Sequence, residues 1–152
     1  MANPELMRHL ISLVHLDIDA IHAYQLAIKE IDVQEVKDNL IKFKQDHQRH
    51  LDDLAPFIRS LGGEPPAFKP DFKGYFIKGF TALRSLTGTE GALKAMRSNE
   101  QLTNKTYEDA LTWQMPDEIR SVIQKNRDDE RRHLTYIEDI INQRVWEKKK
   151  IA

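Results

Sequence analysis

Hydrophobic residues recur at alternating spacings of three and four along four long stretches of the chain. This spacing gathers them on one face of an α-helix, whereas a half-buried strand alternates at every second residue. The few Pro and Gly residues cluster between these stretches. The pattern therefore predicts an all-α protein built from four long helices.

Start and stop signals mark the first two predicted helices. We expect the first helix over residues 4–31, with Asn3 as its N-cap. The second should open with a variant of the capping box formed by Asp32 and Glu35. It should stop at Gly62, because Gly readily adopts the left-handed conformation that ends many helices.

About 27 residues, 62–88, separate the second and third predicted helices, whereas links in helical bundles usually need only ~2–8. The apolar pattern over residues 72–86 predicts a short amphipathic helix inside this segment. The third long helix is expected over residues 89–113, and the fourth from Pro116 into the basic end at 147–150. This order predicts a four-helix bundle with one long crossover, in a single domain that spans the whole chain.

Ionisable residues interrupt the apolar face of every predicted helix near its middle. In the second helix, His47 and His50 interrupt an apolar face that continues through Leu54 and Phe57. In the fourth, Glu130 and His133 follow an apolar face that includes Val122. A buried unpaired charge costs several kcal/mol, so proteins rarely keep one without a partner or a metal. We predict that six such side chains converge on a metal centre: Asp17, His47, His50, Glu100, Glu130 and His133.

These positions lie at similar heights in the predicted bundle. Asp17, His47, Glu100 and Glu130 are each about 14–16 residues from the turn that joins their hairpin, or about 21–24 Å at ~1.5 Å per residue. The two hairpins also look like copies, because one offset of 83 residues relates four pairs: Asp17 and Glu100, Tyr24 and Tyr107, His47 and Glu130, and His50 and His133. Such a duplication implies a pseudo-twofold relation between the hairpins, which would give two metal ions similar ligand sets.

The first and third helices each have a carboxylate seven residues before a Tyr, and the fourth has Glu-x-x-His. This combination resembles the ligand pattern of ferritin-like di-iron proteins. The resemblance to bacterioferritin and rubrerythrin extends from about Leu10 to Gln143. The chain is most similar to a bacterial group of small ferritin-like proteins of unknown function with an Asp-His-x-Arg-His string, here at 46–50. The resemblance implies a ferritin-like bundle that holds two iron ions.

The resemblance also implies a role for each ligand position. Asp17 and His50 would be ligands of the first metal, and Glu100 and His133 would be ligands of the second. Glu130 would bridge the two ions.

The remaining position departs from the family pattern. His47 stands where the family has its second bridging Glu, and a neutral imidazole has one free lone pair and cannot bridge two metals. Either His47 is a terminal ligand or Asp46, on a neighbouring stripe, turns in instead. Because Asp17 is also shorter than the usual Glu, we expect an altered first metal site. Gln48 stands where the haem-binding Met of bacterioferritin would fall, so we expect no haem.

Four residues should surround the ligands: Tyr24, Tyr107, Asp46 and Asp129. We expect the aspartates to orient ligand histidines or to pair with neighbouring arginines, rather than to bind metal. The tyrosines either fill the apolar face or have a supporting or redox role beside the ligands. His15, Asp19 and His22 lie well over 100° round the first helix from Asp17, on a face that we expect to be solvated or to form an interface.

Composition narrows the function further. The chain has no cysteine, which excludes disulfides, iron–sulfur clusters and thiolate ligands within it. Its net charge of -1 does not give the positive surface potential typical of nucleic-acid-binding proteins. No apolar run reaches the ~18 residues that a membrane-spanning helix needs. The N-terminus lacks signal-peptide features. We therefore expect a cytoplasmic protein with no nucleic-acid or membrane partner, whose aromatic crossover either covers the bundle or forms a homodimer surface.

His and carboxylate ligands suit iron, manganese or zinc. The resemblance favours two iron ions and implies a ferroxidase or peroxidase, an oxidoreductase of the kind used in stress responses. Such an enzyme would need an external electron donor. Two alternatives stay open at this point: a metal-binding or storage module without turnover, and a metal-free structural or interaction bundle whose histidines hydrogen-bond to the carboxylates.

Overall fold

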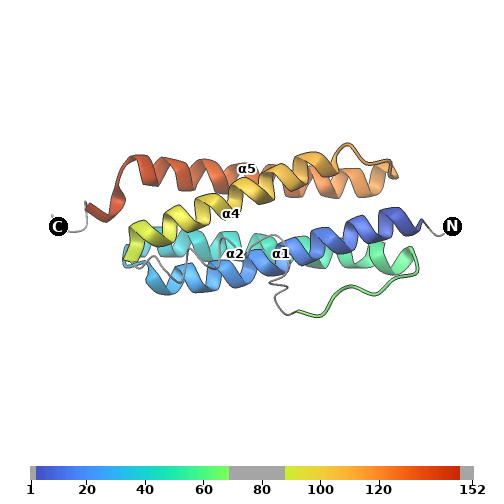
Figure 1. Ribbon diagram of the computed structural model, residues 1–152, viewed down its shortest axis with the longest axis horizontal. Helices are drawn as coiled ribbons and strands as arrows, with labels where there is room; N and C mark the ends of the chain where they lie inside the picture. Colours follow the sequence, from blue (N-terminus) through green and yellow to red (C-terminus); the bar gives the residue numbers. More distant parts are fainter. Residues whose placement is uncertain (1–2, 69–87, 148–152) are drawn as a thin grey trace.

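A computed structural model describes residues 3–68 and 88–147 of the chain. These residues form no strand and four long helices: α1 Pro4–Glu30, α2 Gln34–Ser60, α4 Gly88–Ala110 and α5 Asp117–Asn142. The helices lie side by side, with α1 packed on α2 and α4, and α5 packed on α4 and α2 (Figure 1). The predicted all-α four-helix bundle is confirmed. Within the described ranges, no helix is long and apolar enough to cross a membrane.

The connection between α2 and α4 joins opposite ends of the bundle. In Figure 1, α2 ends near the N-terminus of the chain, whereas α4 begins at the other end. The two helices are therefore parallel, which requires a long crossover. Phe68 in this connection is exposed over 49% of its surface. The short helix predicted over residues 72–86 and its aromatic side chains lie outside the described residues.

Side chains fix the starts of α1 and α2 in different ways. As predicted, Asn3 caps α1, and its Oδ1 accepts a hydrogen bond from the backbone N–H of Leu6 at 3.1 Å. The predicted capping box at Asp32 is wrong, because Val33 is the N-cap of α2 and makes no side-chain capping bond. Asp32 instead accepts a hydrogen bond from the Thr89 hydroxyl at 2.7 Å and donates its backbone N–H to the same oxygen at 3.0 Å. This pair anchors the α1–α2 loop to the start of α4.

The last helix is shorter than predicted. We expected it to continue into the basic end of the chain, but α5 ends at Asn142. Arg144 then adopts a left-handed conformation, with φ of 51°. The break brings Val145 and Trp146 against the hydrophobic core, where both are partly buried. Burial of these two side chains explains why the chain turns here.

The buried faces also shift near the helix ends. The strict three-and-four spacing predicted Phe57 and Val122 in the core, yet both are only partly buried. Their neighbours Ile58 and Ile123 are fully buried instead. A straight helix has 3.6 residues per turn, so a 3.5-residue pattern drifts round it by about 20° per heptad. The prediction therefore holds best near the middle of each helix, where the ionisable layer lies.

Candidate metal centre

The six predicted ligand side chains meet in the middle of the bundle. Each is completely buried, and together they come from all four helices. They form two overlapping groups whose nitrogen and oxygen atoms lie within 4.8 Å of one another. The first group is Asp17, His47, His50 and Glu130; the second is His47, Glu100, Glu130 and His133. Both groups could hold a metal ion, and they share one histidine and one glutamate.

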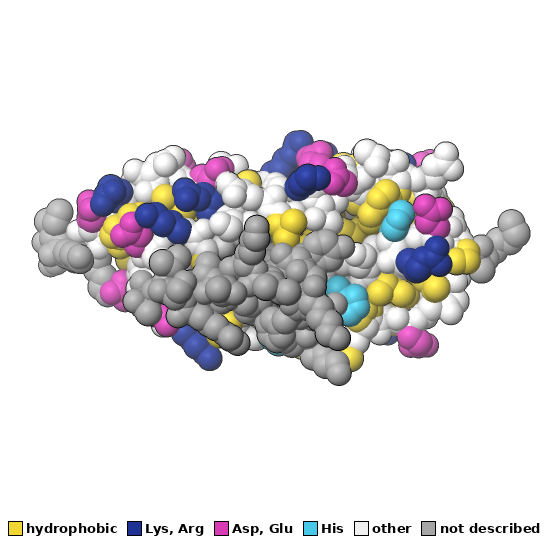
Figure 2. All heavy atoms as spheres, in the orientation of Figure 1, with side chains coloured by type: hydrophobic (Ala, Val, Ile, Leu, Met, Phe, Trp, Pro, Cys, Tyr) yellow, Lys and Arg dark blue, Asp and Glu magenta, His cyan; other side chains and the backbone are white. Residues whose placement is uncertain are grey.

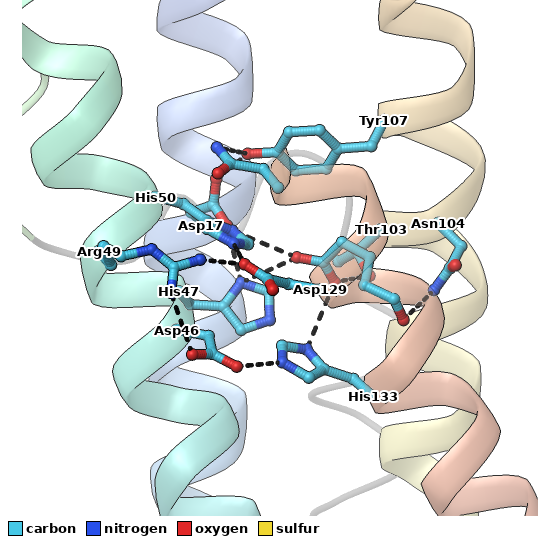
Figure 3. A network of polar contacts seen from close by, with 12 residues as sticks. Asp17, Asp46, His47, Arg49, His50, Thr103, Asn104, Tyr107, Asp129 and His133 are labelled. Carbon is cyan, nitrogen blue, oxygen red and sulfur yellow. Dashed lines mark hydrogen bonds and ion pairs between the residues drawn. The ribbon is translucent and has the colours of Figure 1, made fainter. Parts of the chain in front are cut away.

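In the first group, Asp17 is fully hydrogen-bonded by its neighbours. Its Oδ1 accepts from Nδ1 of His47 at 2.7 Å and from Nδ1 of His50 at 3.0 Å. Its Oδ2 accepts from the Tyr107 hydroxyl at 2.6 Å (Figure 3). Burial alone would raise the pKa of Asp17, but the charge of His50 and the histidine hydrogen bonds lower it below its usual value. Asp17 is therefore a carboxylate, which only accepts hydrogen bonds.

His47 lies between the two groups and contacts both. Its Nδ1 is 2.7 Å from Oδ1 of Asp17 and 3.4 Å from Oε1 of Glu130. Its Nε2 is 3.3 Å from Oε1 of Glu100. Burial would lower the pKa of His47, but the charge of Glu130 and the hydrogen bond to Asp17 hold it well above the usual value.

The second group contains buried polar atoms that lack hydrogen bonds. Among the described residues, Oε2 of Glu100, Oε1 of Glu130 and Nδ1 of His133 have no hydrogen-bond partner. The unsatisfied atoms of Glu100 and His133 lie close together, since His133 Nδ1 is 3.3 Å from Oε2 of Glu100. The unsatisfied Oε1 of Glu130 lies on the side of the first group, 3.4 Å from Nδ1 of both His47 and His50. Each unsatisfied buried group costs about 1–3 kcal/mol. Two carboxylate oxygens and an imidazole nitrogen left without hydrogen bonds suit a bound cation, so the residues present fit a metal ion.

The two buried glutamates also differ in their pKa. For Glu130, burial and the charge of Glu100 raise the pKa above its usual value. For Glu100, burial also favours the neutral form, but the charge of His133 lowers the pKa to well below normal. Glu130 keeps one hydrogen bond, because its Oε2 accepts from the Thr103 hydroxyl at 2.8 Å.

The predicted outer aspartates each contact a histidine of the opposite hairpin. Asp46 in α2 accepts from Nε2 of His133 at 2.8 Å, and Asp129 in α5 accepts from Nε2 of His50 at 3.0 Å. These contacts leave Nδ1 of both histidines facing the centre (Figure 3). In the structure Asp46 faces the outer nitrogen of His133, and it belongs to neither group that could hold a metal ion among the described residues.

Two arginines bind both outer aspartates and so link α2 to α5. Arg49 donates to both Asp46 and Asp129. Arg132 donates to Asp46 at 2.8 Å and to Asp129 at 3.1 Å. Burial would raise the pKa of Asp46, but its hydrogen bonds from His133 and Arg132 lower it to about 2. The two aspartates and the two arginines form a quartet with no net charge. This quartet holds the outer nitrogens of the ligand histidines in place.

The two predicted tyrosines occupy equivalent positions but make different contacts. Both are completely buried. The Tyr107 hydroxyl donates to Asp17 and accepts from Nδ2 of Asn126 at 3.4 Å. The Tyr24 hydroxyl makes no hydrogen bond within the described part of the chain. Burial and the charge of Glu100 raise the pKa of Tyr24 well above its usual value.

Sequence reasoning missed two residues that support the glutamates. Thr103 bonds Glu130 as described above, and Asn104 donates to the backbone oxygens of Glu100 at 2.7 Å and Glu130 at 2.9 Å. Asn104 therefore ties α4 to α5 beside the centre. Their positions one turn after Glu100 were the available signal, since residues three and four apart share a helix face.

The second histidine cluster on α1 lies apart from the centre. Neither His15 nor His22 belongs to a group that could hold a metal ion among the described residues. Both are partly buried, and the His22 ring packs on Phe68 with 5.1 Å between ring centroids. Asp19 is buried, so the solvated alternative is wrong at that position, whereas an interface on this face stays a prediction.

Comparison with known proteins places the chain in a family without assigning a function. No curated protein and no solved structure matches the chain. A family model described as a domain of unknown function, DUF2383, matches residues 5–113. The matched region includes Asp17, His47, His50 and Glu100, and it ends before Glu130 and His133. Because the match spans most of the chain, the protein belongs to the DUF2383 family.

Proposed function

We propose that this protein binds two metal ions, with iron as the preferred metal, in a ferritin-like bundle. The observation that carries the proposal is the set of unsatisfied atoms on Glu100, Glu130 and His133. A cation bound there would be ligated by atoms that otherwise stay buried without hydrogen bonds. A second ion would be held by Asp17 and His50, with Glu130 as a shared ligand.

The metal-free alternative accounts for only half of the buried layer. Hydrogen bonds between Asp17 and its two histidines satisfy these three residues of the first group without a metal, but Oε1 of Glu130 beside them has no hydrogen-bond partner among the described residues. The second group has no equivalent set of bonds around Glu100 and His133. A structural layer selected for specific packing would be expected to satisfy both halves, because a partly satisfied polar network is costly.

The donor set limits the choice of metal. Carboxylate oxygen and imidazole nitrogen suit iron, manganese and zinc, and the chain has no cysteine to favour a thiolate site. The resemblance to bacterioferritin and rubrerythrin favours iron. Gln48, at the position of the haem-binding Met, is exposed and bonds Asp52 at 3.4 Å. The absence of haem stays a prediction.

Iron held by these residues would supply the redox chemistry needed to reduce O₂ or peroxide. The protein itself orients the ligands and excludes water. Asp46 and Asp129 direct Nδ1 of His133 and His50 inward, and none of the six ligand side chains is exposed to solvent. Tyr107 holds its proton against Asp17, where burial raises the pKa of the tyrosine well above its usual value. Turnover would require electrons from a separate donor.

A metal-binding module without turnover is the second candidate. Two observations favour it: His47 replaces a bridging glutamate, and the complete burial of the ligands leaves no open position facing solvent. Aerobic titration with Fe(II) separates the candidates. Oxygen or peroxide consumption that continues over many equivalents supports an oxidoreductase, whereas consumption or binding that stops at two ions per chain supports the module.

Single histidine variants test the ligand assignment. We expect His133→Ala to lower the affinity for Fe(II) by more than 10-fold, because it removes one of four donors of the second group. His9→Ala is a suitable control, since His9 is remote from the centre and packs on Trp113. Equal Fe(II) affinity of His133→Ala and the unmodified protein would rule out the assignment.

A further inference from the structure

Resting on the proposed metal centre, we propose that His47 bridges the two metal ions through both of its ring nitrogens. The centre would then have one imidazole bridge and one carboxylate bridge, Glu130, in place of two carboxylate bridges. His47 and Glu130 are the two residues that belong to both candidate groups. The ring of His47 would carry an ion on each side.

The Nδ1 side of the His47 ring faces the first group. This nitrogen lies 2.7 Å from Oδ1 of Asp17 and 3.4 Å from Oε1 of Glu130. Nδ1 of His50 is 3.0 Å from the same Asp17 oxygen and 3.4 Å from the same Glu130 oxygen. Four ligand atoms of a tetrahedral ion with bonds of about 2.0–2.1 Å are separated by roughly 3.3 Å. The four distances above are within about 0.6 Å of this separation, and all four atoms lie within 4.8 Å of one another.

The Nε2 side of the same ring faces the second group. It lies 3.3 Å from Oε1 of Glu100, and the other oxygen of Glu100 lies 3.3 Å from Nδ1 of His133. Glu130 extends into this group as well, since its Oε2 is 3.8 Å from Nδ1 of His133. A terminal ligand needs only one inward nitrogen, as His50 and His133 illustrate. His47 presents both nitrogens to carboxylates of the centre and has no outer aspartate among its contacts.

Charge balance supports the bridge. The quartet of Asp46, Asp129, Arg49 and Arg132 is neutral by itself, so it leaves the charge of the inner layer unchanged. Two divalent ions bring four positive charges, and the inner carboxylates of Asp17, Glu100 and Glu130 supply only three negative charges. Net charge in a wholly buried site is costly.

Loss of both ring protons from His47 supplies the fourth negative charge. Bound cations lower the pKa of their ligands strongly enough to displace such protons. Each ion takes the lone pair of one ring nitrogen, and the two protons pass to solvent. The imidazolate thus restores the charge that the missing glutamate would have carried.

The separation of the two ions tests the bridge directly. With metal–nitrogen bonds of about 2.0–2.1 Å on opposite sides of one ring, two ions lie roughly 6 Å apart. The ions of common two-metal sites lie about 3.5–4 Å apart. Glu130 can span the longer distance through its two oxygens, because Oε1 lies in the first group and Oε2 near His133 of the second. We suggest crystallising the full chain loaded with Zn(II), which is redox-inert, and locating the ions by anomalous scattering at the zinc edge. Two ions about 6 Å apart, on either side of the His47 ring, are expected.

A matched pair of variants adds a second readout. His47→Glu restores the usual bridging residue, so two ions should remain and their separation should fall to about 4 Å. His9→Glu, the control outside the centre, should keep the separation of the unmodified protein. An unchanged separation in His47→Glu would overturn the bridge.

The outcomes also distinguish the bridge from the metal centre itself. Two ions only 3.5–4 Å apart in the unmodified protein, or a single ion per chain, would overturn the bridge and leave metal binding intact. A chain that takes up no Zn(II), Fe(II) or Mn(II) would overturn both proposals.

Discussion

Hydrogen bonding distinguishes the two halves of the buried layer at the level of single residues. Asp17 accepts three hydrogen bonds, whereas Oε2 of Glu100, Oε1 of Glu130 and Nδ1 of His133 have no hydrogen-bond partner among the described residues. The pseudo-twofold positions are thus chemically unequal, although both come from the same helical spacing. The tyrosines and the outer aspartates allow this inequality to be measured.

The equivalent tyrosines should respond differently to loss of the hydroxyl. Tyr107→Phe leaves a buried oxygen of Asp17 without its donor and should lower the free energy of unfolding by about 1–3 kcal/mol. Tyr24→Phe removes a hydroxyl that has no partner among the described residues and should change it by less than about 0.5 kcal/mol. Urea denaturation of chelator-treated protein measures both. Equal losses for the two variants would contradict the asymmetry.

The outer aspartates should control metal affinity without binding metal. Asp46→Asn and Asp129→Asn weaken the acceptors for Nε2 of His133 and His50, so each should lower metal affinity by about 10–100-fold. Asp52→Asn is the matched control, because Asp52 is an exposed residue of α2 that accepts a hydrogen bond from Gln48. Competition with a fluorescent chelator gives the affinities. Affinities equal to that of the control would show that the orienting contacts are dispensable.

At the scale of the helices, end signals explain some boundaries and long-range contacts explain others. The end of α2 follows its local sequence: Gly62 has a φ of 91°, and the backbone N–H of Gly63 donates to the oxygen of Ile58 at 3.0 Å. The start of α2 does not, because Thr89, 57 residues away, engages the side chain of Asp32. A local capping rule cannot anticipate a partner from another helix.

Substitution at Gly62 tests the local explanation. Gly62→Ala should lower the free energy of unfolding by about 1–2 kcal/mol, because an L side chain disfavours the left-handed conformation. No atom lies within 4 Å of the added Cβ, so a steric clash does not contribute. Gly62→Asn should cost less. Thermal denaturation compares the variants, and an Ala variant as stable as the unmodified protein would contradict the explanation.

At the scale of the whole molecule, three histidines in the centre of the metal-free chain hold their protons to a higher pH than a free histidine does. The pKa values of His47 and His50 are raised, and that of His133 is raised to about 10, where burial opposes protonation but the charge of Glu100 outweighs it. A group with a raised pKa stabilises the folded state fully below its unfolded pKa, about 6.5 for His, and loses this effect as pH rises through the folded pKa.

The melting temperature of the metal-free protein should therefore fall as pH rises from 7 towards 10. His133→Gln should show a smaller fall, because one of the titrating groups is gone. Metal binding needs deprotonated ligands, so the stabilisation by added Zn(II) should grow over the same pH range. Differential scanning calorimetry with and without Zn(II) measures both trends. A melting temperature of the metal-free protein that does not change with pH would contradict this account.

The bundle and the convergence of the six central residues could both be predicted from the sequence, because both follow from helical periodicity. Periodicity is weaker at the helix ends, where Ile58 and Ile123 replace the predicted Phe57 and Val122 in the core. It also says nothing about pairing between hairpins, so the contact of Asp46 with His133 required the packed structure. Asn104 stayed unnoticed because an amide on a helix face is common, and its link between two backbones arises only when α4 meets α5.

The central claim, that the buried layer is a two-metal centre, is tested most directly by the number of ions bound per chain. Metal-stripped protein would be dialysed anaerobically to equilibrium against Fe(II), Mn(II) and Zn(II) separately, and the bound metal measured by elemental analysis. The account predicts two ions per chain for Fe(II), and fewer than two for His133→Ala at the same free concentration. A protein that binds none of the three metals would contradict the claim.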